Sequence, residues 1–81
     1  MLQYIWMIYY TKHAKERMLL RGITEIMVKN AFLKPDEIST GYEGKSLIFK
    51  KFKNGVIKVV FINKKSSKVI ISVIWKSLNK N

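Results

Sequence analysis

The sequence predicts a single α+β domain with two short helices near its start and a strand-rich second half. Hydrophobic residues recur with a helical period between residues 12 and 33, and the pattern changes to strand-like alternation after Pro35. Glycine and Asn-Gly turn signals separate the later segments. With 81 residues, 48% of them hydrophobic, the chain suffices for one domain with a thin core. We therefore expect residues 1–81 to form an N-terminal strand and a helix pair packed on a small antiparallel β-sheet.

The N-terminal segment is expected to form the first strand, because residues 5–10 are aromatic and β-branched. Its apolar run is too short to cross a bilayer, which takes about 20 residues. It also has neither the basic residues nor the cleavage site of a signal peptide. No membrane partner is therefore expected. The alternative is a native start at Met7, in which case the residues before it, within the segment 1–7, are an extension. Residues 77–81 are expected to be a frayed tail.

Two helices are predicted from their end signals. Thr11 is a good N-cap and Gly22 a good C-terminal residue, so residues 12–21 are expected to be helical. Their buried side should consist of Ala14, Met18 and Leu19.

Thr24 is the expected N-cap of a second helix, which Pro35 ends. Because only residues 22–24 join the two helices, we expect a compact helix pair.

The second half is expected to be an antiparallel meander. The Asn54-Gly55 pair is a strong hairpin signal, and residues 64–68 form a second polar turn. The predicted strands cover residues 36–41, 45–52, 56–63 and 69–76.

Alternation along these strands predicts which side chains share a face. Lys58 should share a face with Val60 and Ile62. In the last strand one face should carry Val69, Ile71, Val73 and Trp75, and the other Ile70, Ser72, Ile74 and Lys76.

The net charge of +11 is unevenly distributed along the chain. Residues 44–81 contain ten lysines and no acid, and all five acids lie in residues 1–43. A segment without acids cannot neutralise itself by internal ion pairs, which favours a polyanionic partner such as RNA or DNA. A lysine-favouring AT-rich genome is the alternative explanation, but it leaves the missing acids unexplained. Cysteine is absent, which excludes disulfides, cysteine-ligated zinc and thiol catalysis and fits a cytoplasmic location.

The only histidine and both arginines lie in the first predicted helix, at His13, Arg17 and Arg21. A spacing of four residues places them on one stripe of the helix. The chain has fourteen lysines, so arginine is used selectively here. Its planar fork matches phosphate oxygens better than the point charge of lysine does. This stripe is the first candidate site for chemistry on a phosphate.

The same helix carries a motif that resembles domain-of-unknown-function family 4258, whose members are similar to RelE-like toxin ribonucleases. The resemblance covers about residues 8–76, and Ser72 stands where the family often has threonine. It rests on Tyr10-Thr11-Lys12-His13-Ala14, Arg17-Met18, Arg21-Gly22-Ile23-Thr24 and residues 30–37.

The resemblance implies a RelE-like fold and a metal-independent endoribonuclease without cofactors, in which the ribose 2′-hydroxyl attacks the adjacent phosphate. That reaction needs a base, cations and an acid. His13 would be base or acid, Arg17 the phosphate clamp, and Arg21 a second clamp or a positioning residue. Further nucleic-acid contacts are expected from Lys12, Lys51, Lys58, Ser72 and Lys76. An acidic antitoxin would then be the protein partner.

His13 is expected in the first helical turn, beside Lys12 and in a cationic protein, which disfavours the protonated ring and suits a base. Lys58, Ser72 and Lys76 would form the floor of a basic groove, with the helix stripe as one wall.

Two other functional hypotheses remain open from the sequence. One is a noncatalytic RNA- or DNA-binding module of plasmid or viral origin, in which the basic second half is the main site. The other is a structural subunit of a larger complex. In both, His13 and the two arginines belong to a solvated helix surface, and the aromatic residues belong to the core.

Overall fold

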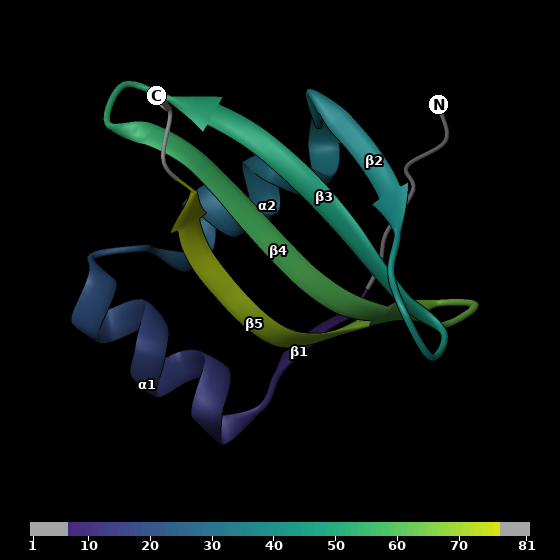
Figure 1. Ribbon diagram of the computed structural model, residues 1–81. Helices are drawn as coiled ribbons and strands as arrows, with labels where there is room; N and C mark the ends of the chain where they lie inside the picture. Colours follow the sequence, from purple (N-terminus) through teal and green to yellow (C-terminus); the bar gives the residue numbers. More distant parts are fainter. Residues whose placement is uncertain (1–6, 77–81) are drawn as a thin grey trace, which may run out of the picture.

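The computed structural model describes residues 7–76 as two helices and a five-stranded sheet (Figure 1). The start of the expected first strand, the proposed extension and the expected tail lie largely outside these residues. The α+β class is as predicted. In chain order the elements are β1 (Met7–Tyr10), α1 (Lys12–Arg21), α2 (Glu25–Leu33), β2 (Glu37–Thr40), β3 (Lys45–Phe52), β4 (Gly55–Asn63) and β5 (Ser67–Lys76).

The helix ends confirm the predicted caps. The Thr11 hydroxyl accepts a hydrogen bond from the backbone N–H of Ala14 at 3.1 Å, and Gly22 ends α1 in the left-handed conformation at φ 69°. The Thr24 hydroxyl caps α2 by accepting from the Met27 N–H at 3.2 Å. The predicted burial of Leu19 is wrong, because this side chain is 82% exposed. At 100° per residue it lies on the flank of α1, away from the buried row of Ala14 and Met18.

The strand order is β1-β5-β4-β3-β2, with β2 to β5 forming the expected antiparallel meander. The expectation of an entirely antiparallel sheet is wrong, because β1 pairs with β5 in parallel. The two helices carry the chain from β1 to the far edge of the sheet. Three successive hairpins then bring it back, so that β5 arrives beside β1 running in the same direction.

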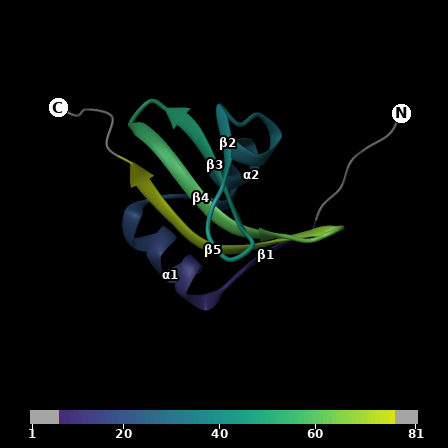
Figure 2. The same cartoon turned by 45° about the vertical axis from the view of Figure 1, so that its right-hand side comes forward.

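Both helices cover the same face of the sheet (Figures 1 and 2). α1 packs on β5 and β1, whereas α2 packs on β3, so each helix makes its main contacts with the sheet. The expected compact helix pair is not confirmed. The core between helices and sheet consists of Ala14, Met18, Ile23, Val28, Ala31, Phe32, Ile48, Ile57, Val59, Phe61, Ile70 and Val73.

A register shift in β5 changes the predicted assignment of its faces. Val60 pairs with Ser72, but the next residue, Phe61, pairs with Ile70, so Ile71 is an extra residue in β5. The bulge reverses the alternation, and Ile70 joins Val73 in the core. The prediction that Val69 and Val73 share a face is therefore wrong, while the grouping of Ser72 with Ile74 and Lys76 holds.

The β3–β4 hairpin is shifted by one residue from its predicted turn. Phe52 pairs with Gly55, which leaves Lys53 and Asn54 as the two loop residues. The positive φ lies at Gly55, at 146°, and Asn54 is not in the left-handed region. Glycine is suited to this position because L side chains rarely adopt a φ of 146°, whereas a Cβ would make only an ordinary contact with the Trp75 ring at 3.5 Å.

Candidate nucleic-acid interface

The face of the sheet opposite the helices carries the candidate site, and we call it the open face. The strand pairings assign its side chains, because residues paired across strands point to the same side. Its central part consists of Lys45, Leu47, Phe49 and Lys51 of β3, Val56, Lys58, Val60 and Ile62 of β4, and Val69, Ser72, Ile74 and Lys76 of β5.

Three of the lysines lie at one end of the open face. Lys51 and Lys76 flank Val56 in one cross-strand row, and Lys58 lies in the next row, beside Phe49. Strands are about 4.8 Å apart and successive rows about 7 Å, so the three side chains start within about 10 Å of one another. The prediction that Lys58, Ser72 and Lys76 share a face with Val60 is confirmed.

An aromatic ring lies among these cations. The Lys76 ammonium is 5.0 Å from the centroid of the Phe49 ring, a cation–π distance. Phe49 is half-buried and pairs with Glu37 of β2 on its other side. Sequence reasoning missed Phe49 and Lys45 as site residues, although alternation from Lys51 back to Lys45 places both on the same face.

A hollow of about 750 Å³ on the open face adjoins this cluster through Lys58 and extends toward the β2–β3 connection. Its floor includes Leu47 and Val60, which are paired across β3 and β4. The remaining lining residues come from neighbouring rows and from the β2–β3 connection: Thr40, Gly41, Tyr42, Glu43, Lys45 and Lys58.

The β2–β3 connection is a tight turn that presents Tyr42. The Gly41 N–H donates to the Lys45 carbonyl at 2.8 Å, and the Lys45 N–H donates to the Tyr42 carbonyl at 3.1 Å. Glu43 and Gly44 both adopt positive φ, at 56° and 77°. Tyr42 is 88% exposed, the highest value among the large hydrophobic side chains at the described surface.

The predicted catalytic residues lie on α1. His13 and Arg17 are both exposed and one turn apart, and Lys12 is exposed at the start of the helix. The stripe is therefore present on the surface, as the spacing indicates. The N-terminal turn that holds His13 also presents backbone N–H groups, which favour anions.

Arg21, the third member of the stripe, has a structural role. Its Nη1 donates to the Val73 carbonyl at 2.9 Å, and its own carbonyl accepts from Trp75 Nε1 at 2.9 Å. These two bonds join the end of α1 to β5 beyond the point where β1 stops pairing at Ile70. These contacts of Arg21 do not involve a phosphate.

The structure does not combine the helix stripe and the sheet lysines in one groove. Ala14 and Met18 anchor α1 in the core on the covered face, whereas Lys58 and Lys76 lie on the open face. Strand alternation in the sequence predicts that Lys58 and Lys76 point to the open side of their strands. Only the tertiary structure shows that α1 packs on the opposite face of the sheet.

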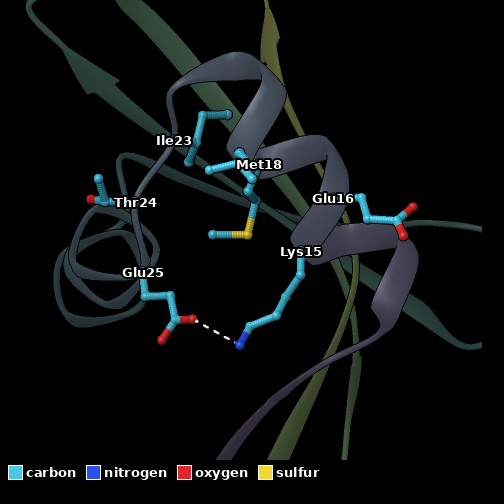
Figure 3. Close-up of a pocket in the computed structure, with 7 residues that line it drawn as sticks. Lys15, Glu16, Met18, Ile23, Thr24 and Glu25 are labelled. Atoms are coloured by element: carbon cyan, nitrogen blue, oxygen red, sulfur yellow. Dashed lines mark ion pairs between the residues drawn. The ribbon is translucent and has the colours of Figure 1, made fainter.

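A second cleft, of about 410 Å³, separates the two helices (Figure 3). Met18 and Ile23 line its inner part, and Lys15 Nζ lies 3.4 Å from Glu25 Oε2 across its opening. Both partners of this ion pair are more than half exposed, so it contributes little stability. The cleft contains none of the predicted site residues.

Tyr10 is a titratable group near this region with a perturbed environment. Burial, with a smaller effect from the charge of Glu25, raises the pKa of Tyr10 to about 12. The phenol therefore keeps its proton to a higher pH than an exposed tyrosine does. Its ring packs against the core from β1.

Residues 7–76 contain no group of three or more His, Cys, Asp or Glu side chains that could hold a metal ion. In the same part of the chain, neither helix has the length and apolar character needed to cross a membrane.

Comparison with known proteins identifies the family. A family described as a domain of unknown function, DUF4258, matches residues 10–75, which include both helices and almost the whole sheet. The chain belongs to the DUF4258 family. The predicted family resemblance is thus confirmed. Neither a curated protein nor a solved structure matches the chain.

Proposed function

We propose that this DUF4258 domain binds nucleic acid through the open face of its sheet. The observation that carries the proposal is the cluster of Lys51, Lys58 and Lys76 in two adjacent rows of a face that no helix covers. Strands β3, β4 and β5 contribute no acid to this face, and the one acid that a described strand places on it is Glu37 of the edge strand β2. A polyanionic backbone would relieve the repulsion among these cations and release its own counterions.

The apolar side chains between the lysines support the same proposal. Phe49, Val56 and Ile74 are half-buried on the open face. Bases and sugars offer flat apolar surfaces that pack on such side chains, while phosphates meet the cations. The domain would act in the cytoplasm, where RNA and plasmid or viral DNA are accessible.

A second candidate function is the metal-independent endoribonuclease of RelE-like toxin type. It is supported by the exposed His13 and Arg17, which lie one turn apart at the positive end of α1. In this proposal, Arg17 binds the phosphate and His13 moves the proton of the 2′-hydroxyl. An acidic antitoxin would be the partner that covers the basic surface.

The binding proposal is tested by salt titration of affinity for a labelled RNA and a labelled DNA. The variant replaces Lys51, Lys58 and Lys76 with glutamine. The matched control replaces Lys29, Lys34 and Lys53, which are exposed outside the open face, so that net charge changes equally. Each lost phosphate contact should reduce the slope of log K against log salt by roughly 0.7 to 0.9.

We expect the open-face variant to lose about two units of slope and the control to lose less than one. Equal losses in both variants would reject a localised site. Absence of binding by the wild-type protein at about 100 mM salt would reject nucleic-acid binding altogether.

The ribonuclease proposal is tested by induced expression in a bacterial host of the wild type, His13→Ala and Arg17→Ala. Growth arrest with RNA cleavage, relieved by either substitution, would establish a nuclease centred on α1. Normal growth and intact RNA, with soluble protein present, would reject it in favour of a binding module.

A further inference from the structure

The hollow beside the β2–β3 turn differs in kind from the lysine cluster. It combines an apolar floor, Leu47 and Val60, with an almost fully exposed aromatic ring, Tyr42. Lys45 and Lys58 lie in the rows on either side of the Leu47–Val60 row. Cations alone are enough to bind a phosphate, whereas an apolar floor and an aromatic side chain can pack against a planar ring.

We propose that this hollow receives an unpaired base, so that the domain selects single-stranded over double-stranded nucleic acid. The inference rests on the proposed binding function and specifies its substrate class. The base would lie over Leu47 and Val60 and stack on Tyr42. The phosphates before and after it would meet Lys58 and Lys45.

The physical reason is the accessibility of the base faces. In a duplex the bases are stacked and paired, so a protein surface meets only phosphates and base edges. A hollow lined by apolar side chains gains nothing from a phosphate, because burying a charge against them costs free energy. A splayed base presents its whole face, and stacking on an aromatic side chain is tolerant of sequence.

The dimensions of the hollow agree with a ligand of this kind. Its volume of about 750 Å³ lies within the range of small-molecule sites, roughly 300 to 1,000 Å³. Tyr42 is held at its rim by the turn hydrogen bonds of Gly41 and Lys45. The Lys45 ammonium lies 3.4 Å from the Glu43 carboxylate, an exposed pair that a phosphate can displace.

The test compares one labelled strand of about 12 nucleotides, as RNA and as DNA, with the same strand annealed to its complement. Fluorescence anisotropy at fixed salt gives the affinities of the wild type, Tyr42→Ala and Ile26→Ala. Ile26 is the matched control, because it is an exposed large side chain on α2, which packs on the covered face of the sheet. Both substitutions are at the surface, and circular dichroism checks the fold.

We expect the wild type to bind the single strand at least tenfold more tightly than the duplex. Tyr42→Ala should weaken single-strand binding about five- to a hundredfold and leave duplex binding unchanged, as expected for loss of one stacked base. Ile26→Ala should change neither affinity by more than about twofold.

Equal affinity for strand and duplex, or an unchanged single-strand affinity in Tyr42→Ala, would overturn the base site. In either case, loss of binding in the open-face lysine variant would still support the proposed function. Absence of wild-type binding to both probes would reject the two proposals together.

Discussion

The hydrogen bond from Arg21 to the Val73 carbonyl gives a test of whether this arginine is structural. Replacing Arg21 with methionine keeps an apolar stem of similar length but removes the donor from a partly buried carbonyl. A hydrogen bond that involves a charged group contributes roughly 1.5 to 3 kcal/mol. Because this site is only half-buried, we expect a loss near the lower limit, about 1.5 kcal/mol of unfolding free energy.

The assay is urea unfolding followed by circular dichroism, with Arg17→Met as the matched control. Arg17 lies one turn earlier on the same helix, is exposed, and should change the unfolding free energy by less than about 0.5 kcal/mol. The Trp75 hydrogen bond to the Arg21 carbonyl is retained in both variants, since it uses the backbone. Equal stability of the two variants would refute the structural role of Arg21.

Two further predictions concern the same half of the molecule. Gly22→Ala should destabilise the protein by about 1 kcal/mol in urea unfolding, because alanine is strained at φ 69°; a neutral effect would contradict the observed helix end. The pKa of Tyr10 is raised from 10.0 to about 12 in the folded protein, so the phenol loses its proton at a lower pH in the unfolded state than in the folded state. The free energy of unfolding should therefore fall as the pH rises from 10 to 12. We expect a fall of about 1 kcal/mol, which is less than the free energy that corresponds to the whole pKa shift, since the ring is only half-buried. Lysines titrate in the same range, so the measurement is the difference between wild type and Tyr10→Phe; a pH-independent difference would contradict it.

The local elements were predictable because their signals lie within a few residues. Thr11 and Gly22 satisfy the end groups of α1 through bonds to neighbours in sequence, and Pro35 ends α2 in the same local way. The β3–β4 hairpin was found but misplaced by one residue. Its position is set by the strand register, in which Phe52 pairs with Gly55.

The candidate site was predictable only in part. Alternation in β4 correctly grouped Lys58 with Val60, because strand periodicity is set by the backbone. The exposed Tyr42 carried no signal in the sequence beyond its place between two glycines. Its contribution to a hollow arises from the turn that folds it beside Leu47 and Val60.

Residue order in this chain is enough to specify the class of fold, the helix boundaries and the uneven distribution of charge, since each depends on local propensity or on composition. Tertiary structure decided the parallel pairing of β1 with β5, the bulge at Ile71 and the face on which the helices pack. These features arise from contacts between segments far apart in the chain. Because the helices bury one face of the sheet, the other face is left uncovered. For that reason, the stripe of His13 and Arg17 lies on a helix that packs on the covered face, and the lysines of the open face form a separate surface.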